Sequence, residues 1–377
     1  MSQTIFEMKQ IFYLFLIFTR MEQLGPFHIF FTLSCGEARW AEMYISVLQV
    51  KGRKVKYTTK DWDGSADTVL VCLTPEEIEA NEEISTEDAT IEDIYIPLSE
   101  YKEKYIKSVT NFFKDHYVLL TRIFDDRVKN FLKNILMLQG VAYYAYRIEF
   151  QMRGMAHVHG VLWLKNEKTK GLLNENKQFM FNNEDVEPDM IEFIDSWTTC
   201  ALPEDDKDLY DKVKSVNSHA CLGPCKKKGT CRFNFPRLPS KRTLIAKPNP
   251  FNLEEEELKV ELETAKLVLS NVKQALIDLE KNNLEPDPEE TLDSFIMKAA
   301  GVEYEVYERC LQYSERGNVI VLKRTVQEKR VNNYNPLFLR AWDANIDVQA
   351  SLSFEYYDFE AISKLANHYI SRYFSFI

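Results

Sequence analysis

The stretch from Val141 to Leu164 constrains the fold of this 377-residue chain more than any other part of the sequence. Two apolar and aromatic runs, residues 141–151 and 157–164, flank an Arg153-Gly154 pair that is typical of a tight turn. The pattern predicts a β-hairpin. Because side chains alternate across a strand, a hairpin here also predicts which residues share a face.

The second predicted strand contains His157 and His159, separated by the apolar Val158. In a strand this spacing projects both imidazoles from one face, while Val158 points into the core. Glu149 and Gln151 share a face of the preceding strand, so one of them can complete a set of three ligands. Mixed nitrogen and oxygen ligands suit a divalent ion such as Mg²⁺ or Mn²⁺. The alternative is two polar residues on an exposed strand.

Periodicity in the rest of the chain predicts further strands and helices. Strands are expected at residues 27–35, 68–73, 91–97 and 318–324, and helices at 41–50, 101–138 (two helices), 252–281, 337–345 and 362–374. The long helix from Asn252, an acceptable N-cap with Glu255 three positions on, carries an apolar seam that must pack against another helix. An intramolecular helical hairpin is favoured over coiled-coil dimerisation.

A cluster of possible zinc ligands lies in a loop-rich region from residue 171 to 250. His219, Cys221, Cys225 and Cys231 supply four soft or borderline ligands at close spacing, as a structural Zn²⁺ site requires. Cys200, further upstream, is an alternative ligand, and buried thiols without a metal are the alternative to the site itself. The odd total of seven cysteines and this crowding favour reduced thiols over a disulfide framework.

The net charge of −11 argues against nucleic-acid binding, because Lys and Arg usually dominate affinity for phosphate. The charges are, however, segregated. Acid is concentrated at 75–93 and 184–208 and base at 226–242 and 323–330, so a basic face remains possible beside the simpler reading of solvated loops. The longest apolar run, residues 11–18, is too short to span a membrane, and we expect a soluble, intracellular protein without a membrane partner.

The segment from Glu149 to Leu164 closely resembles the metal-binding motif of the Helitron replication initiators, members of the histidine-hydrophobic-histidine (HUH) endonuclease superfamily. Leu24 to Trp40 resembles the first motif of that family, and the segments Val321 to Arg324 and Asn332 to Trp342 resemble a later block. The resemblance covers the chain from about residue 24 to its end. It implies an α+β fold with a central antiparallel sheet flanked by helices. It also places Gln151 as the third ligand, with Glu149 in reserve.

The resemblance also implies a pair of nucleophiles, Tyr369 and Tyr373, whose hydroxyls share one face if this segment is helical. A tyrosine that attacks phosphorus leaves a covalent phosphotyrosine, which conserves the energy of the broken strand for rejoining. An ordinary aromatic helix face is the alternative. Close Cys and His residues before a Cys-Arg-Phe-x-Phe-Pro segment are likewise expected in the family, as in Cys231 to Pro236.

The function that follows is metal-dependent nicking and rejoining of single-stranded DNA. The family continues past the second tyrosine with a basic residue and later a helicase, whereas this sequence ends at Ile377, so we expect a helicase to act in trans. Alternatives are a truncated, catalytically dead DNA-binding remnant and an unrelated zinc hydrolase. The substrate favours the nucleus, with the cytoplasm as the alternative, and the oligomeric state is open.

The expected organisation has five parts. A segment of unassigned role, residues 1–23, precedes a nuclease core at 24–170 that contains an acidic insertion at about 51–100. The Cys/His region at 171–250, a helical insertion at 251–300 and a C-terminal part at 301–377 with the paired tyrosines complete the chain.

Overall fold

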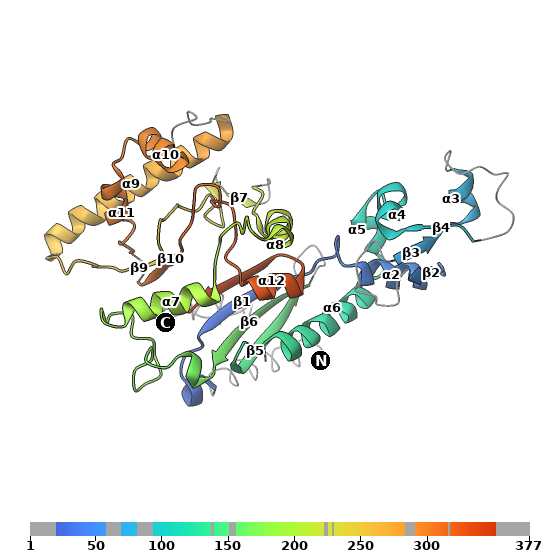
Figure 1. Ribbon diagram of the computed structural model, residues 1–377, viewed down its shortest axis with the longest axis horizontal. Coiled ribbons are helices and arrows are strands. Elements are labelled where there is room, and N and C mark those ends of the chain that lie inside the picture. Colours follow the sequence, from blue (N-terminus) through green and yellow to red (C-terminus); the bar gives the residue numbers. More distant parts are fainter. Residues whose placement is uncertain are drawn as a thin grey trace, which may run out of the picture. The chain divides into compact units, whose positions relative to one another are not determined.

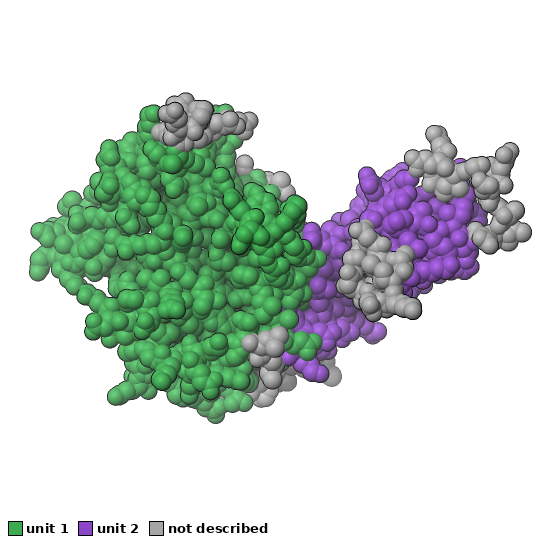
Figure 2. Space-filling view, viewed as in Figure 1, with its two compact units in different colours: residues 1–34, 134–149, 157–377 green, residues 35–133, 150–156 purple. Residues whose placement is uncertain are grey.

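The computed structural model describes residues 20–57, 69–80, 93–136, 139–150, 156–221, 225–227, 230–282, 291–315 and 317–351. The chain forms two compact units (Figure 2): unit 1 comprises residues 1–34, 134–149 and 157–377, and unit 2 comprises residues 35–133 and 150–156. The fold is mixed α+β with antiparallel sheets, as the sequence predicts. The helix expected at 362–374 lies outside the described residues.

Unit 1 is built on a four-stranded sheet with the strand order β11-β1-β6-β5 (Figure 1). Its strands are β1 (Ile29–Ser34), β5 (Val141–Phe150), β6 (Ala156–Leu164) and β11 (Ile346–Ala350). Strand β1 pairs antiparallel with both β6 and β11, so strands from the two ends of the sequence meet in one sheet. The neighbouring positions of β5 and β6 agree with the predicted hairpin, whereas β11 was not expected.

One face of this sheet is covered by α7 (Glu187–Trp197) and α12 (Pro336–Trp342). The ring of Phe338 on α12 packs edge-on against Phe31 on β1 and against Trp197 on α7, at centroid distances of 6.4 and 6.2 Å. Asn335 caps α12 by accepting a hydrogen bond from the Phe338 N–H, and its side-chain amide donates to the Trp197 carbonyl. The cap therefore joins the two helices as well as starting one of them.

The other face of the sheet is apolar at one end only. Residues 20–24 are helical, and Met21 packs there with Phe30, Val161 and Trp163. The Trp163 indole N–H donates to the Gly25 carbonyl at 2.9 Å, which satisfies its polar atom inside the core. The polar end of this face carries the two histidines of β6.

A helical layer and several short elements complete unit 1. The layer consists of α9 (Glu255–Asn282), α10 (Leu292–Ala300) and α11 (Tyr304–Cys310), and the seam of α9 packs against both shorter helices, as the intramolecular alternative predicts. The short elements are the 3₁₀ turn Asn166–Lys168, α8 (Lys207–Lys212), the π-helical turn Val213–Asn217, β7 (Lys226–Lys227), β8 (Thr230–Cys231), β9 (Leu244–Ala246) and β10 (Val319–Val321).

The prediction that Asn252 caps α9 is wrong. The helix begins at Glu255, and Asn252 adopts a left-handed conformation with φ of 50°. The entry turn is instead held by Asn249, whose side chain accepts from the Leu253 N–H and donates to the Leu253 carbonyl, both at 2.9 Å. A short polar side chain that bonds the backbone ahead of a helix competes with a cap at the later asparagine.

Unit 2 contains a three-stranded antiparallel sheet and five helices within its described residues. The strands β2 (Val55–Tyr57), β3 (Val69–Cys72) and β4 (Tyr95–Pro97) lie in that order, with α2 (Ala41–Val50), α3 (Pro75–Glu79), α4 (Leu98–Tyr105), α5 (Val109–Phe113) and α6 (Tyr117–Phe131). A π-helical turn, Leu132–Leu136, follows α6. Three helices replace the two expected from 101 onward, because Ser108 caps a separate α5 through the Asn111 N–H.

None of the helices in the described parts of the chain is long and apolar enough to cross a membrane.

Candidate functional site

The two histidines of β6 lie on the sheet face that α7 and α12 do not cover. His157 and His159 are partly exposed, whereas Val158 between them is completely buried. This alternation is the one the sequence predicts for a strand. Gly160 follows on the buried face, where the ring of Phe31 occupies the space that a β-carbon would need. The packing of one face thus fixes which side chains the strand presents on the other.

Glu149 lies beside His159 on the same face. Its Oε2 is 3.2 Å from the His159 Nε2, which places a carboxylate on β5 against an imidazole on β6. Two ligands in adjacent positions of an octahedral ion with bonds of about 2.1 Å are about 3 Å apart, so this pair fits one divalent cation. The donor set, imidazole nitrogen with carboxylate oxygen, also suits Mn²⁺ or Mg²⁺.

Gln151, the ligand that the family resemblance favours, lies outside the described residues, as do the two tyrosines, Tyr369 and Tyr373. Their placement beside the histidines therefore stays a prediction. Glu149, the reserve ligand, is the acidic group that the described structure brings to His159.

Strand pairing adds two residues to this face that the sequence interpretation missed. Thr32 on β1 pairs with His159 on one side and with Asp347 on β11 on the other, and directly paired residues of antiparallel strands point to the same face. Asp347 accepts a hydrogen bond from the Gln349 side chain at 2.7 Å. The row Asp347, Thr32, His159 therefore carries acid, hydroxyl and imidazole across three strands.

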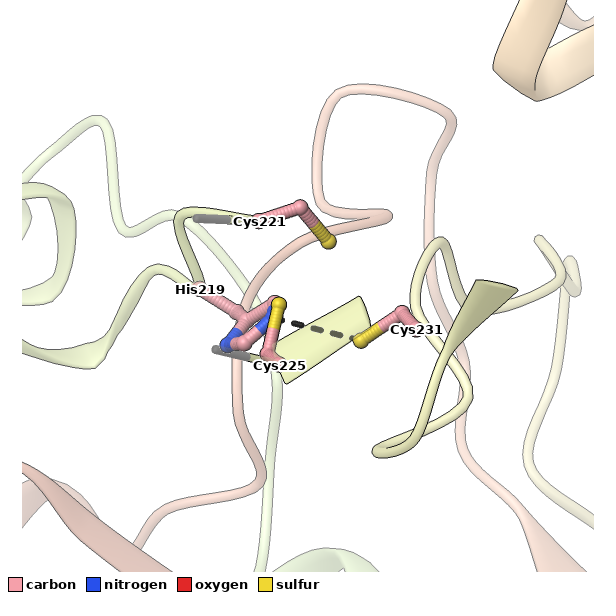
Figure 3. Close-up of side chains that lie close together, drawn as sticks. All are labelled: His219, Cys221, Cys225 and Cys231. Carbon is pink, nitrogen blue, oxygen red and sulfur yellow. Dashed lines mark hydrogen bonds between the residues drawn. The ribbon is translucent and has the colours of Figure 1, made fainter. Parts of the chain in front are cut away.

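The Cys/His cluster is assembled as the sequence predicts. Figure 3 shows the side chains of His219, Cys221, Cys225 and Cys231 turned toward one another, and their ligand atoms all lie within 4.8 Å of each other. The Cys231 Sγ and the His219 Nε2 are 3.3 Å apart. Ligands of tetrahedral zinc, with bonds of about 2.0–2.3 Å, are about 3.5 Å apart. The Cys231–His219 pair matches this spacing, and all four atoms are close enough together that the cluster could hold one Zn²⁺.

The surroundings of the cluster favour a thiolate at Cys231 and hold the histidine, whereas burial raises the pKa of the Cys221 thiol. Burial alone would raise the pKa of the Cys231 thiol, but hydrogen bonds from the backbone of Phe235 and Phe233 hold this pKa below its usual value. The His219 ring stacks on Phe235 at 4.5 Å. Arg330 donates to the Cys221 Sγ and also pairs with Glu280 on α9, so the cluster is tied to the helical layer. Four protein ligands leave no open coordination position, which is typical of a structural site.

Cys200 does not belong to the cluster, which settles that alternative. Its side chain is completely buried, and its Sγ lies 3.2 Å from the Lys323 carbonyl oxygen. Burial raises the pKa of its thiol to about 11, and this thiol donates to the Lys323 carbonyl instead of facing the four residues of the cluster.

Comparison with known families gives an independent assignment for the first part of the chain. Residues 16–162 match the family described as the Helitron helicase-like domain at the N-terminus. This part of the chain is therefore similar to the N-terminal domain of the Helitron proteins. The match includes β1, β5 and both histidines of β6, whereas the Cys/His cluster and β11 lie beyond it. No curated protein matches the chain.

Proposed function

We propose that the chain is a metal-dependent, tyrosine-dependent endonuclease of the histidine-hydrophobic-histidine class that nicks and rejoins single-stranded DNA. The observation that carries the proposal is the shared exposed face of His157, His159 and Glu149, with 3.2 Å between the Glu149 Oε2 and the His159 Nε2. The match to the Helitron domain, whose end includes both histidines, supports the same assignment.

His157 and His159 would hold the divalent cation together with Gln151 or Glu149. Such an ion supplies Lewis-acid polarisation of the scissile phosphate. The residues of the chain contribute rigidity: the imidazoles lie on a central strand, and Val158 is buried beneath them. A site on a strand of a packed sheet holds its ligands more precisely than a loop would.

Tyr369 and Tyr373 are the proposed nucleophiles. In the proposed step the tyrosine hydroxyl loses its proton and its oxygen bonds to phosphorus. The bond from phosphorus to the leaving nucleotide oxygen breaks, and that oxygen takes up one proton, so the proton count is unchanged. The reverse reaction rejoins the strand. With an ordinary pKa near 10, a tyrosine is a weak nucleophile at neutral pH, so the reaction depends on activation of the phosphate.

Covalent capture tests this function. The purified protein is incubated with 5′- or 3′-labelled single-stranded DNA and Mn²⁺, denatured, and resolved by electrophoresis for a protein–DNA adduct. We expect an adduct with the wild type and none with His157→Ala or with the double variant Tyr369→Phe/Tyr373→Phe. DNA binding without any adduct would instead identify a catalytically inactive DNA-binding protein.

A second comparison identifies the third ligand. Glu149→Gln and Gln151→Ala are assayed for adduct formation over a series of Mn²⁺ concentrations. Because removal of a group that only orients a ligand already costs about 10- to 100-fold in metal affinity, loss of the ligand itself should raise the metal concentration needed for half-maximal adduct by at least about 10-fold. If Glu149 acts as the ligand, Glu149→Gln shows this shift and Gln151→Ala does not; the opposite result assigns the role to Gln151.

The substrate also suggests a partner protein and a location in the cell. A nicking enzyme acts where DNA is single-stranded, so we propose that a helicase provides the unwound strand in trans. Nuclear residence is proposed on the same ground.

A further inference from the structure

An exposed turn leaves the Cys/His cluster directly after β8 and consists of Arg232, Phe233 and Asn234. The Arg232 N–H donates to the Cys225 carbonyl at 2.9 Å, and the Asn234 N–H donates to the Cys231 carbonyl at 3.0 Å. The backbone of the turn is therefore bonded to two residues of the cluster. An element held in this way presents its side chains in a defined orientation.

The turn exposes an aromatic ring beside a guanidinium group. Phe233 is 47% exposed, although so large an apolar side chain is usually buried. The Arg232 Cζ lies 4.6 Å from the centroid of its ring, and the His219 ring stands at 74° to it with a centroid distance of 5.6 Å. The ring is thus oriented by its neighbours and still accessible.

Further positive charge lies next to this turn. Lys273 on α9 donates to the Asn234 carbonyl at 3.3 Å, and the Arg237 guanidinium lies over the ring of Phe235, 5.1 Å from its centroid. Within the described residues, no acidic side chain pairs with Arg232, Arg237 or Lys273. In a chain with a net charge of −11, this leaves a local excess of positive charge around an exposed aromatic ring.

A second exposed arginine–phenylalanine pair in unit 1 has the opposite electrostatics. The Arg309 Cζ lies 4.6 Å from the centroid of Phe251, which is 37% exposed, so the two pairs have the same geometry. Arg309, however, is neutralised by Glu261 at 3.2 Å. The two pairs therefore share the distance between guanidinium and ring. They differ in charge, because Arg309 is paired with a carboxylate and, in the part of the chain that the structure describes, Arg232 is not.

We infer that Arg232, Phe233, Arg237 and Lys273 form a binding surface for single-stranded DNA, on which Phe233 stacks on a base and the cations contact flanking phosphates. A phenylalanine can stack on any base, and nearby Lys and Arg side chains follow the backbone, so this surface binds single strands with little sequence preference. The inference rests on the proposed function for its ligand. The proposed surface would be a second contact with the DNA, in addition to the proposed metal site at His157 and His159.

Fluorescence anisotropy tests the surface with a fluorescein-labelled oligothymidylate. The assay uses zinc-loaded protein carrying His157→Ala, so that no cleavage occurs. We expect Phe233→Ala to weaken binding by roughly 5- to 150-fold, the loss expected for one stacked base, and Phe233→Trp to restore it. Arg232→Gln should weaken binding and also reduce the dependence of affinity on salt, by about 0.7 in the logarithmic slope.

The matched controls are Phe251→Ala and Arg309→Gln, which remove the same side chains at the neutralised pair and should leave the affinity unchanged. Circular dichroism and zinc content confirm that each variant is folded. Equal effects at both pairs, unchanged binding by Phe233→Ala, no binding by the parent protein, or tighter binding of duplex DNA would each overturn the inference.

The covalent capture assay separates this inference from the proposed function. If Phe233→Ala loses affinity while the wild type never forms an adduct, the surface is correct and the nuclease proposal fails. If the wild type forms an adduct and Phe233→Ala binds as the parent does, the surface fails and the nuclease proposal remains.

Discussion

The ring of Phe31 lies directly over the α-carbon of Gly160. A β-carbon added at Gly160 would come within 3.0 Å of three atoms of this ring, and Phe31 cannot move away because it is completely buried against Phe338. We therefore expect Gly160→Ala to destabilise the protein by about 1–3 kcal/mol through overpacking. Urea denaturation followed by circular dichroism measures the change.

The second variant Phe31→Leu provides the control for that prediction. Removing the ring should relieve the clash with the added β-carbon. The double variant Gly160→Ala/Phe31→Leu is therefore expected to lose less stability than the sum of the two single variants. Simple additivity of the two losses would contradict the proposed contact.

Buried His28 predicts a pH dependence of stability. Burial lowers its pKa to about 4, and its Nδ1 accepts a hydrogen bond from the Leu164 N–H at 2.9 Å. Because the folded pKa lies below the ordinary value of about 6.5, this contribution to stability is complete above pH 6.5. It is lost as the pH falls from 6.5 to about 4, the range in which the unfolded chain binds the proton more strongly than the folded one. The loss approaches about 3 kcal/mol.

His28→Gln removes this titration while keeping an oxygen that can accept from Leu164. Its free energy of unfolding, measured by urea between pH 7.5 and 4.5, should change less with pH than that of the wild type. An identical slope in the two proteins would show that other groups cause the dependence.

The Cys/His cluster predicts one zinc ion per chain. Elemental analysis of the purified protein should find it, and Cys225→Ser should abolish it and lower the melting temperature, because metal binding contributes to folding. The matched control is Cys200→Ser, which changes a buried thiol outside the cluster. Zinc lost equally from both variants would contradict the ligand assignment.

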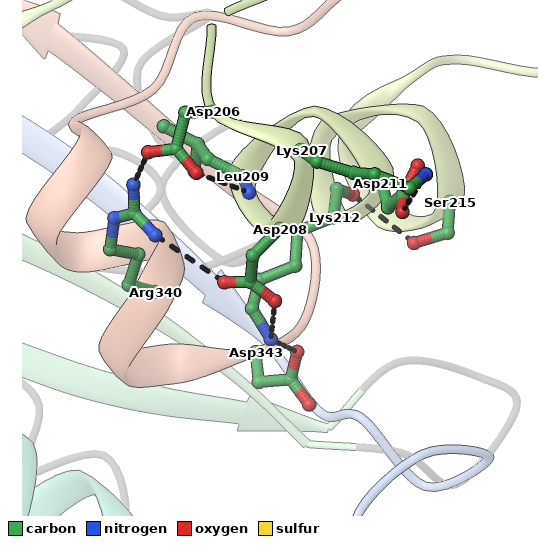
Figure 4. Close-up of polar contacts among 9 residues, drawn as sticks. All are labelled: Asp206, Lys207, Asp208, Leu209, Asp211, Lys212, Ser215, Arg340 and Asp343. Atoms are coloured by element: carbon green, nitrogen blue, oxygen red, sulfur yellow. Dashed lines mark hydrogen bonds and ion pairs between the residues drawn. The ribbon is translucent and has the colours of Figure 1, made fainter.

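Asp206 serves two purposes, as Figure 4 shows. Its carboxylate caps α8 by accepting from the Leu209 N–H at 3.2 Å, and it also pairs with Arg340 on α12. Asp206→Ala should cost about 1–2 kcal/mol through loss of both interactions. Asp206→Asn keeps a capping oxygen and should cost only about 0.2–1 kcal/mol, since exposed ion pairs contribute little. Urea denaturation distinguishes the two; equal losses would show that the cap contributes nothing.

Local patterns were sufficient to predict much of the fold. The helix α2 and the strands around His157 could be predicted from their own residues. An element that buries one face needs apolar side chains at its own spacing, and that spacing is visible in the sequence. Strand β11 was not predicted although Ile346, Val348 and Ala350 alternate with polar residues, since the stretch is short and begins only four residues after the end of α12.

The candidate site likewise contains residues that local patterns predict and residues that they do not. The four members of the Cys/His cluster are close in sequence, and residue type with spacing was enough to assemble them. Thr32 and Asp347, by contrast, join the histidine face through strand pairing, and no local pattern reports which distant strands become neighbours. The sequence therefore predicts the ligands of a site more readily than the residues around it.

The pairing of β1 with β11 has a consequence for biosynthesis. Residues 29–33 find their partners at residues 346–350, so the earliest strand of the sheet must wait for more than three hundred further residues to leave the ribosome. Until then β1 has an unpaired edge, which is an open template for aggregation. We expect nascent chains of this protein to require chaperones, and the row from Asp347 to His159 to form only late in synthesis.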